Sequence, residues 1–287
     1  MFCKVCDRKE GFCLSNASNP LVSVIMGAYN SEKTIGRAID SIIKQTYLHW
    51  EMIICDDGST DGTVKIIRKY VEKDKRIKLV QNKKNSGLAY SLNHCLKYSS
   101  GKYVARMDAD DISLPERFAY QVGFFEKNPE YDVVGCNRIV FDENGDSGIR
   151  KSKEIPTIND MYKGSPFAHP TIMMKRSVYT ILGGYRVNKD TTRSEDLEMW
   201  FRFFNEGFRG YNLQRVLFKY QETSEDFYKR SLRAAYGITK VLLRGYKLIG
   251  VSKYKYIYAF KPIISAIIPK NIMYRYQERR LHNTEVL

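Results

Sequence analysis

Apolar strand-like runs alternate with helix-like repeats through the first half of this 287-residue chain. The runs begin at Leu21, Trp50, Ile77 and Tyr103, and apolar residues recur at helical spacing between them. A regular alternation of this kind predicts an α/β fold, with a mainly parallel central sheet and helices on both faces. A further strand is expected over residues 131–137.

Polar clusters follow three of these runs at the point where each run ends. They are Ala28-Tyr29-Asn30, Asp56-Asp57 and Asp108-Ala109-Asp110. In open parallel sheets, ligands bind just beyond the carboxyl ends of the strands. The three clusters are therefore predicted to converge on one edge of one sheet and to form a binding site there.

The last cluster is the most acidic, because Asp108, Asp110 and Asp111 lie within four positions. If the strand continued, Asp108 and Asp110 would share one face and Asp111 would lie on the other. Neighbouring carboxylates repel one another and are costly to desolvate without a cation. Mg²⁺ or Mn²⁺ bound together with a phosphate-bearing ligand would meet that need. For Asp111 we expect a structural role as the N-cap of the following helix.

A glycine cradle for phosphates is missing from the sequence. The first run is followed by Gly27-Ala-Tyr-Asn-Ser-Glu-Lys33 rather than by G-x-G-x-x-G, and no P-loop motif occurs. An NAD-dependent oxidoreductase is therefore disfavoured. If a nucleotide binds, a metal held by the acidic cluster is the expected partner of its phosphates.

Taken in order, these motifs resemble family 2 glycosyltransferases over roughly residues 20–220. The segments that carry the resemblance are residues 22–30, 56–61, 85–89 with Asn93, 105–112, 169–171 and 194–196. The resemblance implies a GT-A fold, a nucleotide-sugar donor that is most often UDP-linked, a divalent cation (Mn²⁺ or Mg²⁺) and inversion at the anomeric carbon.

Five residues are assigned to the nucleotide by this resemblance. Ala28 and Tyr29 would line the base pocket, Asp57 would bind the uracil or its ribose, Asp108 would face the ribose, and Asn85 would belong to the same donor site. Asp57 has a simpler interpretation as an Asx-turn residue in a loop rich in Gly and Ser.

Four more residues are candidates for binding the metal, for removing the acceptor proton or for pairing with phosphate. Asp110 would ligate the metal with His169 as a second candidate ligand, and Asp196 would be the general base. Asp196 could instead complement the dipole at a helix N-terminus, and His169 could satisfy only local hydrogen bonds. Arg106 could pair either with phosphate or with a neighbouring acid.

Positive charge is concentrated near the C-terminus. The chain carries a net charge of +15, and residues 227–287 hold thirteen Lys or Arg against two Glu. Ten aromatic residues are interspersed with these cations. We expect residues 227–287 to form a basic helical extension that meets an anionic membrane surface. A soluble cap on the catalytic domain is the alternative, and no nucleic-acid-binding module is recognised.

Three regions are predicted: an N-terminal tail (1–19), a GT-A catalytic domain (20–226) and the extension (227–287). Cys3, Cys6 and Cys13 lie in the tail and lack a fourth ligand at a usual zinc spacing, so free thiols are expected. Neither a signal peptide nor a transmembrane run is recognised, which predicts a cytoplasmic protein at the inner face of the cell membrane.

The predicted activity is therefore transfer of a sugar from a nucleotide-diphosphate donor to a hydroxyl of a glycan or lipid-linked acceptor in cell-surface polysaccharide synthesis. The Gln-x-x-Arg-Trp motif of polymer-building family members is missing, which favours a non-processive enzyme. A catalytically degenerate protein that only binds nucleotide-sugar is the main alternative.

Overall fold

The computed structural model describes residues 19–223 and 231–268. The predicted tail with Cys3, Cys6 and Cys13 lies outside these ranges except for its last residue, as does the predicted boundary at residues 226 and 227. Within them, no helix combines the length and apolar character needed to cross a bilayer.

A parallel four-stranded unit forms the first half of the fold, as the alternation predicts. Its elements are β1 (Val22–Ala28), α1 (Ile35–Ile43), β2 (Trp50–Asp56), α2 (Thr63–Lys73), β3 (Ile77–Gln81), α3 (Leu88–Tyr98) and β4 (Tyr103–Arg106). The strands lie side by side in the order β3-β2-β1-β4, and all three pairings are parallel. The first two strands are almost fully buried, which explains their continuous apolar sequence.

The second half extends this sheet with strands that are not in chain order. Its elements are β5 (Ile112–Ser113), α4 (Arg117–Lys127), β6 (Val133–Asp142), β7 (Gly145–Arg150), η1 (Ile158–Lys163), η2 (His169–Thr171), β8 (Met173–Lys175), α5 (Arg176–Leu182), η3 (Lys189–Thr191), α6 (Glu195–Asn205) and β9 (Gly210–Gln221). The sheet of the described residues continues from β4 through β8, β6 and β9 to β5, with β7 paired to β6. The strand expected over residues 131–137 starts two residues later and runs on to Asp142.

Two apolar cores lie on the two faces of the sheet. Side chains of α1, α2 and α4 build one core, and those of α3, α6 and the C-terminal helices build the other. The α/β architecture with helices on both faces is therefore confirmed.

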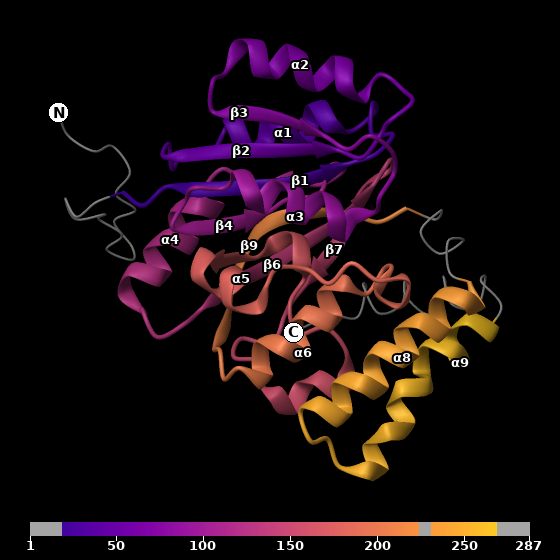
Figure 1. The fold of residues 1–287 in the computed structure, drawn as a ribbon. Coiled ribbons are helices and arrows are strands. Elements are labelled where there is room, and N and C mark those ends of the chain that lie inside the picture. The colour runs from indigo at the N-terminus through magenta and orange to yellow at the C-terminus, as the bar shows by residue number, and fades with distance from the viewer. Residues whose placement is uncertain (1–18, 224–230, 269–287) are drawn as a thin grey trace.

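The C-terminal elements pack beside α6, at the opposite end of the molecule from α2 (Figure 1). They are α8 (Leu232–Leu248), η4 (Lys253–Phe260) and α9 (Lys261–Ile267). At Gly245 a Cβ atom would come within 2.2 Å of the Phe201 ring, so this position brings α8 close to α6. The helical character expected after residue 227 is confirmed for the described part.

Candidate active site

The carboxyl ends of the parallel strands meet at one edge of the sheet. In the ladders, Ala28 pairs with Asp56, Asp56 with Gln81, and Ile25 with Arg106. The chain leaves these strands through the three polar clusters described above. A pocket of about 430 Å³ opens at this edge, and its lining includes Arg106, Asp108, His169, Glu195 and Asp196.

Arg106 lies buried at the base of this pocket. Its Nη2 atom is 2.5 Å from Oδ1 of Asp108, and the Arg106 side chain is 1% exposed. Burial opposes the charge of Arg106, but the adjacent Asp108 carboxylate outweighs it and raises the pKa of the guanidinium above its ordinary value. Of the two partners considered for Arg106, the structure shows the neighbouring acid.

The acidic cluster does not follow strand alternation, because β4 ends at Arg106. Asp108 is half-buried, Asp110 is exposed, and Asp111 is completely buried. The backbone carbonyl of Asp110 accepts a hydrogen bond of 2.9 Å from Nη2 of Arg37, which fixes the turn between β4 and β5.

The expected capping role of Asp111 is wrong. The next helix, α4, begins at Arg117, six residues further on, and Asp111 Oδ1 accepts the backbone N–H of Gln221 on β9 at 2.8 Å. Its Oδ2 atom is buried and has no hydrogen-bond partner among the described residues. Burial, followed by the charges of Asp108 and Asp110, raises the pKa of Asp111 well above its usual range.

These carboxylates fit a divalent cation that shares its ligands with substrate phosphates. The charges of Asp108 and Asp110 reach Asp111, and the Oδ2 atom of Asp111 lacks a protein donor. No group of three or more His, Cys, Asp or Glu side chains within residues 19–223 and 231–268 has the geometry to hold a metal unaided. Mg²⁺ and Mn²⁺ are commonly bound by one or two carboxylates plus phosphate oxygens. Asp110 as a ligand stays a prediction.

His169 contributes a buried imidazole to the pocket. Its Nε2 atom is 2.8 Å from the Tyr185 hydroxyl, and its ring contacts Tyr185 and Trp200 edge to face. Burial, and then the charge of Arg106, lowers the pKa of His169 well below its usual range, so the ring is neutral at neutral pH. The Nδ1 atom has no partner among the described residues. The role of His169 as a metal ligand stays a prediction, with Nδ1 as the available atom.

Asp57 holds the loop between β3 and α3. Its Oδ1 atom accepts hydrogen bonds from Asn82 Nδ2 at 2.7 Å and Ser86 N at 2.9 Å, and its Oδ2 atom accepts from Gly87 N at 2.8 Å. The side chain is therefore no Asx turn within its own loop. About one lone-pair site of this buried carboxylate is left for a ligand, and its contact with a base or ribose stays a prediction.

Three more predicted nucleotide-binding residues lie in this loop or at the end of β1. Tyr29 is 47% exposed and Asn85 is exposed, so both side chains are open to a ligand. Ala28 is buried, and its carbonyl accepts the backbone N–H of Asp57 at 2.8 Å. These contacts place the ends of β1 and β2 next to each other.

Glu195 and Asp196 begin α6 and line the same pocket as Asp108. Burial raises the pKa of Asp196, although backbone N–H groups of the first turn oppose the shift. Burial and then the charge of Asp196 raise the pKa of Glu195 to about 7. Asp196 thus lies in the pocket, as a general base would, and also at the N-terminus of a helix, where its charge would complement the helix dipole.

Several pocket residues were not recognised from the sequence. Glu195 was included in the sequence analysis only within the segment 194–196, next to Asp196. Its raised pKa depends on burial in the folded protein. The cations Arg138, Arg150 and Arg193 also line the pocket. The first two come from β6 and β7, whose place in the sheet no local motif reveals.

Comparisons with known proteins agree on one family. A family model described as glycosyl transferase family 2 matches residues 23–182, and a second, glycosyl transferase family group 2, matches residues 103–274. The putative glycosyltransferase EpsE of Bacillus subtilis (strain 168) is 47% identical over 267 residues, which cover 93% of this chain and 96% of that protein.

A second relative and a solved structure extend these findings. WfgD of Escherichia coli, a UDP-Glc:alpha-D-GlcNAc-diphosphoundecaprenol beta-1,3-glucosyltransferase, is 33% identical over 186 residues, covering 63% of this chain and 68% of that protein. The structure of the mannosyltransferase PcManGT from Pyrobaculum calidifontis, in complex with GDP-Man and Mn²⁺, superposes with a TM-score of 0.61. It covers 91% of this chain and 80% of its own at 19% identity, which shows the shared fold.

Proposed function

Since the chain belongs to glycosyl transferase family 2, we propose that it is an inverting, non-processive transferase that moves a sugar from a UDP-sugar to an acceptor hydroxyl. The observation that carries this proposal is a single pocket lined by acids from two elements. Asp108 comes from the cluster that follows β4, and Glu195 and Asp196 come from the start of α6.

The donor is assigned to the edge of the parallel strands. Tyr29 is exposed directly after β1, Asn85 is exposed within the loop that Asp57 holds, and Asp108 lines the pocket. The name of the relative WfgD includes UDP-Glc as its donor, which supports a UDP-sugar here.

The cation would be held by Asp110, with His169 as a further candidate ligand, and Asp108 would face the ribose of the donor. Mn²⁺ or Mg²⁺ would supply charge stabilisation for the leaving diphosphate. The Mn²⁺ in the PcManGT complex supports this choice of metal. The chain's own contribution is a set of carboxylates already packed close together, whose mutual repulsion a cation would relieve.

The acceptor is activated by Asp196. Its carboxylate takes the proton of the acceptor hydroxyl while the oxygen attacks the anomeric carbon. The bond from that carbon to the diphosphate oxygen breaks, and the nucleoside diphosphate leaves with the electron pair. Attack from the face opposite the leaving group inverts the anomeric centre, and one base is enough, unlike the paired carboxylates of hydrolases.

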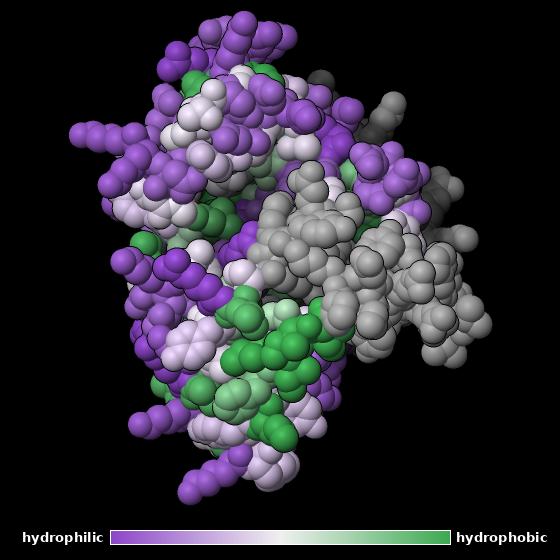
Figure 2. Space-filling view, turned by 90° about the vertical axis from the view of Figure 1, so that its right-hand side faces the viewer, coloured by the Kyte–Doolittle hydropathy of each residue, from purple (hydrophilic) through white to green (hydrophobic). Residues whose placement is uncertain are grey.

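A glycan or lipid-linked acceptor in cell-surface polysaccharide synthesis fits this site. The relative WfgD is named for a diphosphoundecaprenol-linked acceptor. Exposed apolar side chains gather over the C-terminal helices, where Figure 2 shows a continuous apolar area. We assign this face to an anionic membrane surface, with the protein peripheral at the cytoplasmic side.

A thermal-shift panel tests the donor and the metal together. We expect UDP to raise the melting temperature only when Mn²⁺ is present, and NAD to have no effect. Asp110→Ala should remove the Mn²⁺-dependent part of the shift, whereas Glu72→Ala, at an exposed position on α2, should keep it. Stabilisation by NAD alone, or an unchanged Mn²⁺ effect in Asp110→Ala, would contradict the proposal.

A further inference from the structure

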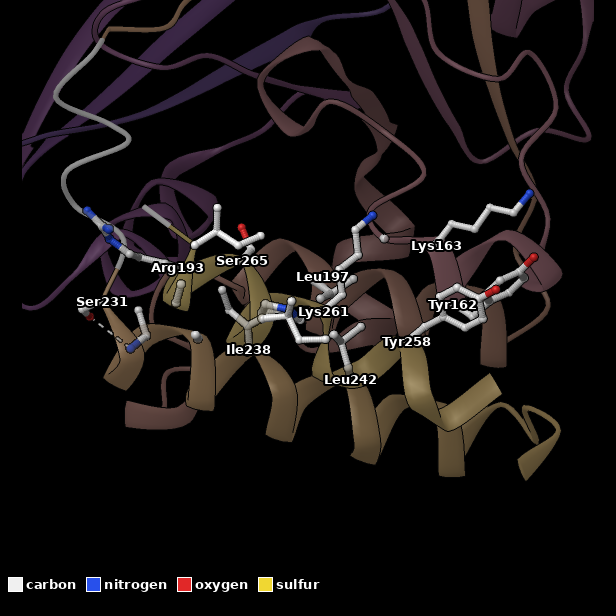
Figure 3. Close-up of a pocket in the computed structure, with 17 residues that line it drawn as sticks. Tyr162, Lys163, Arg193, Leu197, Ser231, Ile238, Leu242, Tyr258, Lys261 and Ser265 are labelled. Carbon is white, nitrogen blue, oxygen red and sulfur yellow. Dashed lines mark hydrogen bonds between the residues drawn. The ribbon is translucent and has the colours of Figure 1, made fainter. Parts of the chain in front are cut away.

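A second cavity, of about 640 Å³, lies between α6 and the C-terminal helices. Figure 3 shows its lining, with Leu197 of α6, Ile238 and Leu242 of α8, and Tyr258 of η4 along one row. Leu197 and Leu242 are each less than a tenth exposed, so the floor of the cavity is apolar. None of the steps of sugar transfer described above uses this space.

The two ends of the cavity carry cations. Arg193 lies at one end and Lys163 at the other, and Lys261 of α9 also contributes to the lining (Figure 3). An apolar floor with positive charge at its ends is complementary to a molecule that joins an apolar chain to an anionic group.

Arg193 connects this cavity to the catalytic pocket. It is the residue that lines both spaces, three positions before Asp196. Its backbone has a positive φ of 66°, a conformation that is uncommon for a residue with a side chain. Left-handed backbone of this kind persists where the surrounding structure requires it, and it occurs often at ligand sites.

From this arrangement we infer that the cavity binds the lipid part of a diphosphate-linked acceptor, an inference that rests on the proposed transferase function. The sugar of the acceptor reaches Asp196 in the catalytic pocket. The diphosphate lies at Arg193, between the two spaces. The first segments of the apolar chain lie along Leu197, Ile238 and Leu242.

Charge argues against the chain's own C-terminal segment as the occupant. Residues 269–287 hold four Lys or Arg against two Glu, so they share the sign of the cations at the cavity ends. A lipid diphosphate has the opposite sign and matches them. On α9, Ile264 lines the cavity and is itself partly exposed, and Ile267 outside the lining is also exposed, so the cavity adjoins a surface suited to membrane lipid.

Farnesyl diphosphate is the probe for this site, with saturating UDP and Mn²⁺ present to fill the donor site. Titration calorimetry should show binding at least about a hundredfold tighter than that of inorganic diphosphate, since burial of roughly four methylene groups accounts for that factor. Equal binding of the two would overturn the inference. Displacement by soluble dihexanoyl phosphatidylglycerol at a similar concentration would also overturn it, because the site would then take membrane lipid.

Three variants locate the probe. Arg193→Ala should weaken farnesyl diphosphate about tenfold, while the matched loss of an exposed cation in Lys247→Ala should leave it unchanged. Ile238→Asp should prevent binding without changing the thermal shift given by UDP and Mn²⁺. Equal effects of Arg193→Ala and Lys247→Ala would overturn the placement of the diphosphate.

A photoreactive isoprenoid diphosphate keeps the test independent of variant stability. We expect adducts on α8, on α9 and on Tyr258, which line the cavity, and adducts confined to Tyr254, an exposed tyrosine of η4 outside the lining, would overturn the inference. If UDP with Mn²⁺ binds and the isoprenoid does not, the acceptor class is wrong while the transferase stands. If UDP with Mn²⁺ does not bind either, the proposed function itself fails.

Discussion

Glu195 and Asp196 are adjacent acidic residues at the start of α6. Both face the pocket, and burial makes the charged form of each carboxyl group costly. A general base is most effective when its pKa lies near the working pH, so a raised carboxylate pKa suits the removal of a hydroxyl proton. We assigned the general base to Asp196 from the sequence. A substitution at Asp196 can test proton removal separately from donor binding.

We expect Asp196→Asn to reduce sugar transfer by about 10²–10⁴-fold, the usual contribution of general base catalysis. Asparagine keeps the size of the side chain but cannot accept the proton. UDP release gives the transfer rate, and the UDP thermal shift with Mn²⁺ should remain within experimental error of the parent protein. Full turnover by Asp196→Asn would show that another group is the base, with Glu195 the first to examine.

Glu195 should make the stability of the protein depend on pH. Its pKa is raised from 4.5 to about 7 in the folded protein, so the folded state binds more protons than the unfolded state between these values. Stability contributed by the protonated form is therefore lost as pH rises from about 4.5 to 7. Glu195→Gln removes this loss, and we expect a gain on the order of 1–2 kcal/mol at pH 8 and none at pH 4, allowing for partial solvent screening.

Urea denaturation at the two pH values measures this difference. Glu72→Gln on α2 is the matched control, because that side chain is exposed. An equal gain at both pH values would mean that the new amide stabilises α6 in another way, and the proposed ionisation would be wrong.

At the scale of elements, the loop between β3 and α3 depends on one buried carboxylate. Asp57 accepts three hydrogen bonds from this loop, two of them from the backbone N–H groups of Ser86 and Gly87. Gly87 immediately precedes α3 and has a φ of 90°, so the loop backbone is held in a conformation that needs support. Removal of the carboxylate would leave these donors without a partner.

Asp57→Ala should lower the free energy of unfolding by about 2–4 kcal/mol, since each buried unsatisfied donor costs about 1–3 kcal/mol. Urea denaturation measures the loss. Asp74→Ala is the control, because Asp74 pairs with the half-exposed Arg76 at the surface and its loss should cost less than about 1 kcal/mol. Similar losses in both variants would show that Asp57 does not hold the loop.

Local patterns were enough to predict the parallel half of the sheet. Each of β1 to β4 is a short apolar run, and single helical crossovers join β1 to its neighbour β2 and β2 to its neighbour β3, while β4 pairs with β1. The order of β8, β6 and β9 depends on long-range pairing, which no local run encodes. The arginines that β6 and β7 bring to the pocket were missed for the same reason.

Site residues were identified from the sequence where the residue type alone indicates its chemistry. They were missed or misassigned where burial in the folded protein determines the role of the side chain. The acids after β4 were identified from sequence, but Asp111 was misassigned because its partner, the backbone of Gln221, is 110 residues away. Arg106 remained ambiguous until its burial against Asp108 was seen. The cavity beside α6 was not foreseen, since its walls come from five separate elements.

At the scale of the whole molecule, the proposed donor site and the lipid-facing surface occupy different parts of the fold. Parallel strands form the donor edge, and α8, η4 and α9 form an apolar flank beside α6 (Figure 1). Side chains exposed on this flank include Ile257 at 70% and Ile267 at 68%, while Lys253, Lys255 and Lys261 lie among them. Aliphatic groups interspersed with lysines are typical of surfaces that lie in a lipid headgroup layer.

Binding to anionic vesicles should therefore depend on both charge and apolar contact. We expect the protein to co-sediment with vesicles containing phosphatidylglycerol, and to do so less as salt rises, because exposed charges are screened within about 10 Å at 0.1 M ionic strength. The double variant Ile257→Asp with Ile267→Asp should bind at least about tenfold more weakly, since each buried isoleucine contributes about 1.5–3 kcal/mol.

The single variant Ile181→Asp is the control, because Ile181 is 61% exposed on α5, away from this flank. Each aspartate adds the same negative charge, so half of any purely electrostatic loss would appear in the control. A loss in the double variant no greater than twice the control's, on a logarithmic scale, would show that the net charge of +15 alone drives association and that the flank is not inserted.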